Sequence, residues 1–288
     1  MNDYVILTDS GCDISEELLN EWKVGLIDLM FRVDGEETEY RQADMGIKEF
    51  YDKMRAGTVF KTAAANSDSL ANAFRKKLDE GLDILYVCFS SGLSGTAGTA
   101  KLTAEQMMSE YPGRTVAVVD TLCASAGEGL ILYYAVKARD NGADLREVER
   151  VLYEKRPQLC HWFTVDDLVY LKRGGRVGAV AAFFGGVLNI KPVLHVDDYG
   201  HLIPVVKVRG RINSIKAIAK KYRESAVDPA GGEYFISHGD CIEDAEKLQS
   251  MLEQEFGHRA ALITNIGPVI GAHSGPGTLA LFFLGKQR

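Results

Sequence analysis

Short apolar runs alternate with amphipathic helical segments along residues 1–156, and few folds accommodate that pattern. Runs such as DILYVCF (83–89) are rich in Val, Ile, Leu and Tyr, as is typical of strands covered on both faces. Segments such as DSLANAFRKKLDEG (68–81) place apolar residues at helical spacing and end at a glycine. This alternation predicts an α/β fold with a parallel, helix-covered sheet. The run VGLIDLMFRV (24–33) is predicted to form a single strand.

The pattern changes after Pro157. LCHWFTV (159–165) predicts a strand, and a tight turn at DDYG (197–200) joins two more, which indicates antiparallel pairing. We therefore expect a second, mixed sheet with helices. The predicted domains are residues 1–157, an N-terminal α/β domain, and residues 158–288, a C-terminal α/β domain. Because no linker composition separates them, they are expected to pack tightly.

Charge and composition argue against several classes of function. A formal net charge of −7 disfavours nucleic-acid binding, because surfaces that bind phosphates are usually basic. The N-terminus has no signal-peptide pattern, which predicts a cytoplasmic location. Five cysteines without close spacing predict neither a disulfide framework nor a metal site. The uncharged run 177–190 is too short to span a bilayer, so no membrane insertion is expected. This run is either a buried core segment or the apolar wall of a ligand cavity.

The stretch CFSSGLSGTAGT (88–99) ends a predicted strand with serines, glycines and threonines. Such a turn is expected to offer free backbone N–H groups and hydroxyls. A helix that begins after it would direct its first amides into the same turn. These features predict a site for a small anion. Further polar loops at 7–11, 60–67 and 270–277 are expected to converge with it, because ligands of parallel sheets bind beyond the carboxyl ends of the strands.

Each loop also has a purely structural explanation, which the sequence leaves open. The Thr62 hydroxyl suits a turn, and His273 suits a hydrogen-bonded structural histidine. The segment GLSGT (92–96) lacks the last glycine of a G-x-S-x-G elbow. Ser94, Asp120 and His273 follow the hydrolase order, although nothing in the sequence brings them together. No P-loop motif is present. Motifs alone therefore assign neither catalytic residues nor a cofactor.

Basic residues gather in two places on this acidic chain. Lys172, Arg173 and Arg176 flank two glycines, and residues 207–223 carry seven basic side chains before the next acid, Glu224. Such clusters suit the docking of a negatively charged partner. The alternative is a solvated helix face.

Six motifs in sequence order together resemble the DegV family. They are TDSGCDIS (8–15), SSGLSGT (90–96), VVDT (118–121), LVYLKRGGRVG (168–178), LNIKPVLHVDDYGHL (188–202) and VIGAHSGPGTL (269–279). Members of this family include the fatty-acid-binding subunits of bacterial fatty acid kinases. The resemblance implies one long-chain fatty acid, roughly C14–C18, in a buried tunnel between two packed α/β domains. It also implies a carrier without catalytic residues or cofactor, whose bound carboxylate a separate kinase catalytic subunit converts to an acyl phosphate.

The resemblance further assigns roles to residues in three groups. The residues that bind the carboxylate are Thr62, Ser94 and His273. A secondary head-group loop comprises Ser91, Gly95, Thr96 and Gly271. The basic residues that face the kinase are Arg173, Arg176, Arg209 and Arg211. Neutral donors at the head group would leave a carboxylate oxygen free to attack phosphorus, whereas a bidentate arginine would occupy both oxygens.

One departure from the family pattern lies beside Thr62. Ala63, Ala64 and Ala65 replace a Ser-Gln-Pro stretch that many relatives carry, which removes polar groups near the expected head group. An alternative function from a different class is a small-molecule serine hydrolase that uses Ser94 and His273.

Overall fold

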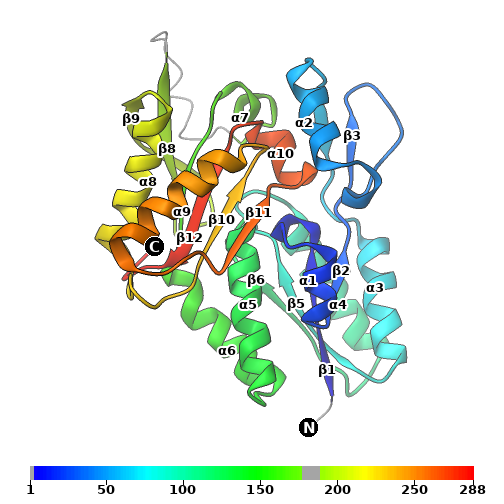
Figure 1. The fold of residues 1–288 in the computed structure, drawn as a ribbon. Helices are drawn as coiled ribbons and strands as arrows, with labels where there is room; N and C mark the ends of the chain where they lie inside the picture. Colours follow the sequence, from blue (N-terminus) through cyan, green and yellow to red (C-terminus); the bar gives the residue numbers. More distant parts are fainter. Residues whose placement is uncertain (1–2, 177–188) are drawn as a thin grey trace.

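The computed structural model describes residues 3–176 and 189–288 and contains two main sheets (Figure 1). The apolar run 177–190, predicted above to be core or cavity wall, lies outside the described residues except for its last two positions. Within the described ranges, no helix combines the length and the apolar content needed to cross a bilayer.

The first sheet is parallel, with strand order β2-β1-β5-β6. Its strands are β1 (Tyr4–Asp9), β2 (Val24–Ile27), β5 (Asp83–Cys88) and β6 (Val116–Asp120). Helices α3 (Ser67–Asp79) and α4 (Thr96–Glu110) cover one face, and α1 (Glu16–Glu21), α5 (Ala126–Asp140) and α6 (Leu145–Lys155) cover the other. Every residue of β5 is buried, which explains its unbroken apolar sequence. The prediction of a parallel, helix-covered sheet is confirmed.

The predicted strand 24–33 is divided between two sheets, so that prediction is wrong in its extent. β2 ends at Ile27, and β3 (Phe31–Val33) pairs antiparallel with β4 (Phe60–Thr62) in a separate two-stranded sheet. The short helix η1 (Ser10–Cys12) follows β1, whereas η2 (Gln42–Asp44) and α2 (Ile47–Arg55) lie between β3 and β4. An aromatic cluster built around Phe31, Phe50 and Phe60 holds this small unit together.

The second main sheet is mixed, with strand order β11-β10-β12-β7-β8-β9. Its strands are β7 (Leu159–Thr164), β8 (Ile190–Val196), β9 (Leu202–Arg209), β10 (Tyr234–His238), β11 (Leu262–Asn265) and β12 (Leu279–Leu284). Among the described strands of this sheet, only the β10–β11 pair is parallel, and the predicted turn at 197–200 joins the antiparallel strands β8 and β9. The remaining helices are η3 (Arg156–Gln158), α7 (Val169–Arg173), α8 (Arg211–Ser225), α9 (Ile242–Phe256) and α10 (Pro268–Ser274). The predicted α/β fold with a parallel and a mixed sheet is confirmed.

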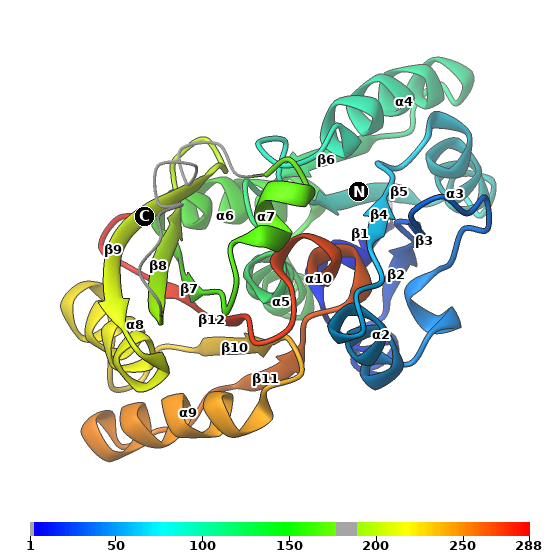
Figure 2. The same ribbon diagram turned by 90° about the horizontal axis from the view of Figure 1, so that it is seen from above.

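Helix α5 lies between the two sheets (Figure 2). One hydrophobic core joins Ile6 and Val87 of the parallel sheet to Phe163 and Phe282 of the mixed sheet through this helix. Gly127 of α5 allows the close approach, because a Cβ there would overlap the ring of His161 and lie 2.8 Å from Phe282. The two sheets therefore share one hydrophobic core, and each also has a separate cluster on its other face.

Candidate functional site

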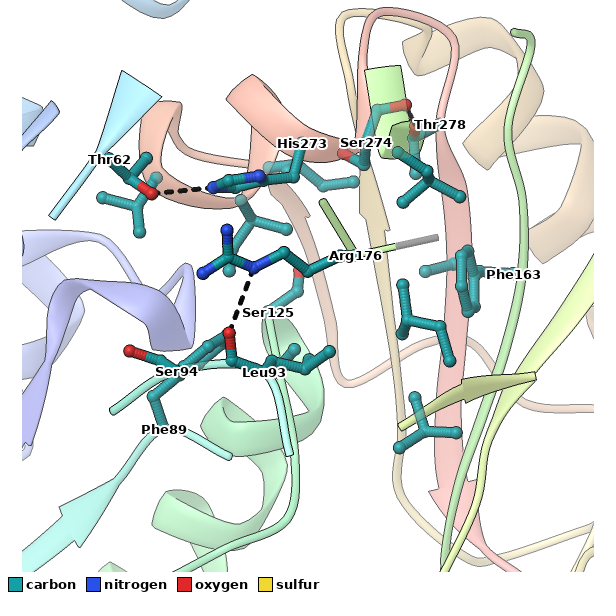
Figure 3. A pocket seen from close by; sticks show the side chains of 18 of the residues that line it. Thr62, Phe89, Leu93, Ser94, Ser125, Phe163, Arg176, His273, Ser274 and Thr278 are labelled. Atoms are coloured by element: carbon teal, nitrogen blue, oxygen red, sulfur yellow. Dashed lines mark hydrogen bonds between the residues drawn. The ribbon is translucent and has the colours of Figure 1, made fainter. Parts of the chain in front are cut away.

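A cavity that is partly open to solvent is lined by residues from both main sheets and from the β3–β4 unit (Figure 3). Polar side chains at one end come from loops and from the ends of a strand and of helices, namely Thr62, Ser94, Arg176, His273 and Ser274. The rest of the lining is largely apolar and includes Leu93, Phe163, Leu171, Val196, Leu202, Val269, Ala280 and Phe282. A cavity with a polar end and a largely apolar remainder suits an elongated amphipathic ligand.

Two of the predicted head-group residues meet directly. Thr62 lies at the end of β4 and His273 on α10, and the Thr62 Oγ1 to His273 Nε2 distance is 2.7 Å (Figure 3). Burial lowers the pKa of His273 to about 4, and the positive charge of Arg176 acts in the same direction. The imidazole is therefore neutral at neutral pH.

The third predicted head-group residue, Ser94, lies in the turn between β5 and α4. Its Oγ is 2.9 Å from Thr96 Oγ1 and accepts a hydrogen bond from the Thr96 backbone N–H. Thr96 Oγ1 in turn accepts from Ala65 N at 3.1 Å, which fixes the loop after β4 against this turn. Ser94 lines the cavity, and Thr96 is a fully buried residue beside it.

Four backbone amides of this turn are not free, contrary to the expectation from the sequence. The N–H of Ser91 donates to Asp120 Oδ1, and the N–H of Gly92 donates to Ser90 Oγ. The N–H groups of Leu93 and Ser94 both donate to the Ser90 carbonyl. These four donors are therefore already paired within the fold and are not available to an anion in this arrangement.

Arg176 places a positive charge inside the cavity. Its Nε donates to Leu93 O at 3.1 Å and its Nη1 to Gly174 O at 2.6 Å, so the guanidinium lies between the Ser94 turn and His273 (Figure 3). No carboxylate within residues 3–176 and 189–288 forms an ion pair with it. A half-buried cation without a counter-ion favours an anionic ligand. In the sequence analysis, Arg176 is assigned to a surface that faces the partner, and that assignment stays a prediction. Nothing in the sequence indicated that Arg176 lines the cavity.

Sequence reasoning missed two serines of the cavity. Ser274 is 6% exposed, and its Oγ has no hydrogen-bond partner in the described part of the chain. Ser274 directly follows His273 in the motif VIGAHSGPGTL, so the sequence could have indicated this residue as well. Ser125 has a φ of 55°, and its Oγ lies 2.9 Å from that of Ser237 on β10. Non-glycine residues in this backbone region are often found at functional sites, but the sequence does not reveal the angle.

Helix α10, which carries His273, is tied to the N-terminal half of the chain. The Gly267 N–H donates to Asp13 Oδ1 at 2.9 Å, and Thr264 Oγ1 donates to the Asp13 carbonyl at 2.8 Å. Tyr51 Oη also donates to Ile266 O at 2.9 Å. These bonds fix the start of α10, so the position of the His273 ring depends on residues from both halves. Burial raises the pKa of Asp13 to about 7.

The other predicted site residues lie around this centre or apart from it. Gly271 packs against α2, where an added Cβ would come within 2.7 Å of Tyr51 Oη. Arg173 is exposed and stacks over the ring of Tyr170, with 5.9 Å between the guanidinium carbon and the ring centroid. Arg209 is exposed on the edge strand β9. Arg211 Nε donates to Asp244 Oδ2 at 2.8 Å, so its charge is already paired.

The hydrogen bonds do not assemble a hydrolase relay in the described part of the chain. Ser94 bonds to Thr96, His273 bonds to Thr62, and Asp120 accepts from the backbone amides of Ser91 and Leu122. The serine hydrolase alternative is therefore not supported. Among the residues described, no cluster of His, Cys, Asp and Glu side chains has the arrangement of a metal site.

Comparisons with known proteins point to one family. The DegV family, described as one of uncharacterised proteins, matches residues 3–286. A DegV domain-containing protein of Clostridium perfringens is 38% identical, with 100% of this chain and 99% of the relative covered. A DegV family protein of Thermus thermophilus, whose solved structure is described by its fatty acid binding, is 30% identical with a TM-score of 0.89, over 99% of this chain and 100% of that one. A stearic acid-binding protein of Eubacterium ventriosum is 25% identical with a TM-score of 0.89, over 98% of both chains.

Proposed function

Because this chain belongs to the DegV family, we propose that it is a lipid-binding carrier that holds one long-chain fatty acid, roughly C14–C18, in the cavity between its sheets. The observation that carries the proposal is the lining of this cavity. One end of the lining is polar and carries the positive charge of Arg176, and the rest is largely apolar. Solved relatives described as binding fatty acids support the same ligand class.

The carboxylate is proposed to lie among Thr62, Ser94, Arg176 and His273. A buried carboxylate needs hydrogen-bond donors to offset the loss of water, and the hydroxyls and the guanidinium of this set supply them. Arg176 adds the charge that the sequence analysis did not expect. Its Nε and Nη1 already donate to backbone carbonyls, so its remaining N–H groups would hold the carboxylate from one side.

The acyl chain is proposed to run along the inner face of the mixed sheet, past Phe163, Ala280 and Phe282. Each buried methylene contributes about 0.8 kcal/mol, so a dozen methylenes contribute roughly 10 kcal/mol. That sum exceeds the cost of burying a well-paired carboxylate. Ala63 and Ala64 line the cavity beside Thr62. Because their side chains have no polar atoms, the carboxylate is proposed to be bound by Thr62, Ser94, Arg176 and His273 alone.

The carrier is proposed to act without chemistry of its own and to present its carboxylate to a separate kinase. A carboxylate oxygen would form a bond to the terminal phosphorus of a nucleoside triphosphate held by the kinase. The bond to the leaving diphosphate breaks with its electron pair, and an acyl phosphate results. Arg173 and Arg209 are exposed and suit the docking role, whereas Arg211 is paired with Asp244. Residues 1–157 and 158–288 are proposed as the two domains that enclose the ligand.

Mass spectrometry of the organic extract from freshly purified protein tests the proposal. The parent is expected to release close to one long-chain fatty acid per chain. Ser94→Ala, His273→Ala and Arg176→Gln are expected to weaken binding, by about 10- to 100-fold for Arg176→Gln, because a charge-assisted hydrogen bond contributes about 1.5–3 kcal/mol.

Two matched variants control for non-specific effects. Ser250→Ala changes an exposed serine of α9, and Arg173→Gln removes an exposed charge three residues from Arg176; both should keep the parent's lipid content. A parent without lipid that also fails to bind added palmitate or oleate would contradict the carrier function. If Ser94→Ala binds these acids as tightly as the parent, the head-group assignment is wrong.

A further inference from the structure

The lining of the cavity ends at one row of the mixed sheet. The last lining residues of β12 and β7 are Phe282 and His161, which pair with each other. Two residues farther along, on the same face, Leu284 pairs with Leu159, and neither of these lines the cavity. At about 3.3 Å per residue, Phe282 lies about 13 Å along the chain from Thr278, which lines the opposite part of the cavity. We call the end at the Phe282–His161 row the tail end.

Two loops lie at the tail end. The loop 121–125, between β6 and α5, carries the lining residue Ala124. The turn 197–200 joins β8 and β9, and the last residues of β8 lie beside the start of β7 because these two strands are antiparallel. The loop and the turn are in contact, since a Cβ added to Gly200 would lie 3.3 Å from the Cα of Leu122. Together they form the wall beyond the last row.

Arg288, four residues beyond β12, joins both loops to the start of β7. Its Nη1 donates to Leu122 O at 2.9 Å and to Asp197 O at 3.2 Å. Its Nε donates to Leu159 O at 3.0 Å, one row beyond the end of the lining, and its Nη2 to Arg156 O at 3.0 Å. The half-buried Arg288 does not line the cavity itself. It therefore acts on the cavity by positioning the segments that do.

The loop 121–125 needs such support. Leu122 and Ser125 have φ values of 53° and 55°, a backbone region that is unfavourable for residues other than glycine. Strained backbone of this kind persists only where the surrounding structure holds it in place. The guanidinium of Arg288 supplies part of that hold through the carbonyl of Leu122 and through Cys123 Sγ, to which Nη2 donates at 3.3 Å.

We propose that Arg288 is a positioning residue that keeps the tail end of the cavity closed and so limits the length of the acyl chain that the protein holds; this inference rests on the proposed function. A chain that extends past the Phe282–His161 row must displace the loop 121–125 or the turn 197–200. While Arg288 holds both, additional methylenes gain no further burial. Affinity should therefore rise with chain length only until the methyl end of the acid reaches this row.

Titration of delipidated protein with laurate, myristate, palmitate, stearate and arachidate tests the inference. In the parent, affinity is expected to rise about fourfold per added methylene and to stop rising before arachidate; the acid at which the rise ends is the length limit. Arg288→Met keeps a long side chain without its donors and should move the length limit to a longer acid or abolish it. Arg288→Lys keeps a charged donor and should restore the limit in part. Lys286→Met removes an exposed cation two residues away and should keep the parent's limit.

A second variant tests the tail end without altering Arg288. Ala124→Leu adds volume to the wall of the cavity and should move the length limit to a shorter acid. An unchanged limit in Ala124→Leu would place the methyl end of the acid elsewhere and overturn the inference. The proposal therefore stays testable even if Arg288→Met folds poorly.

The possible outcomes separate this inference from the proposed function. A general loss of stability would weaken the binding of all five acids alike and leave the length limit in place. If the affinity of the parent rises through the whole series, or if Arg288→Met keeps the parent's limit, the inference is overturned and the carrier function stands. If the parent binds none of the acids, the carrier function itself fails and the inference fails with it.

Discussion

Replacing Asp13 by Asn should make the protein more stable at alkaline pH. The Asp13 side chain is 2% exposed and accepts a hydrogen bond from Gly267 N through Oδ1, and its Oδ2 has no hydrogen-bond partner among the residues that the structure describes. Burial raises its pKa from 3.8 to about 7. Between these two values the folded protein holds a proton that the unfolded chain has released, so stability is lost as pH rises towards 7. At about 1.4 kcal/mol per pH unit over about three units, the full loss is roughly 4–5 kcal/mol.

Asparagine keeps the oxygen that accepts from Gly267 but does not ionise. It also tolerates the φ of 54° at position 13 better than most residues. Urea unfolding at pH 5, 6, 7 and 8 should therefore show the free-energy difference between Asp13→Asn and the parent growing by about 2–3 kcal/mol in favour of the variant. The buried carboxyls Asp9 and Glu128 are present in both proteins, so their titration largely cancels in the difference.

A second substitution separates the charge from the hydrogen bond. Asp13→Ala removes the acceptor and leaves the Gly267 N–H unpaired, so it should lose about 1–3 kcal/mol relative to Asp13→Asn at every pH. A difference between Asp13→Asn and the parent that stays constant from pH 5 to 8 would refute the reasoning. So would a variant that becomes relatively less stable as the pH rises.

Three further outcomes are expected. Gly127→Ala should lower the free energy of unfolding by about 1–3 kcal/mol, measured in urea, because its Cβ would overlap the His161 ring. Ala280→Leu fills part of the cavity, so extracts of that variant should contain shorter acyl chains than extracts of the parent; identical chain lengths would place the acyl chain elsewhere. Proton NMR should find His273 neutral above about pH 5, and Arg176→Gln should raise its pKa because a neighbouring positive charge is removed; an unchanged pKa would place the guanidinium farther away.

The local sequence predicted the parallel sheet and the position of the polar turn for clear physical reasons. A strand buried on both faces, such as β5, has an unbroken apolar sequence, and the turn after it must leave the sheet at the carboxyl edge. The meeting of Thr62 and His273 came from the resemblance to a family. Local patterns alone cannot bring together residues from β4 and α10, which are far apart in the sequence.

Other features depend on tertiary contacts that no local pattern encodes. The run 24–33 is mostly apolar, yet the chain leaves one sheet after Ile27 and joins another at Phe31. The amides of the serine turn are paired because Ser90 and Asp120 are positioned to accept from them. Arg176 is in a basic, glycine-rich stretch that indicates an exposed surface, but its guanidinium lies in the cavity.

The position of β12 has a consequence for how the protein is made. This strand comes after all the other described strands along the chain, yet it lies between β10 and β7 in the middle of the mixed sheet. While the ribosome is still synthesising residues before 279, β10 and β7 both present an unpaired edge, which is a site for aggregation. The cavity wall formed by Ala280 and Phe282 is also missing at that stage. The lipid site can therefore form only after residue 284 has left the ribosome.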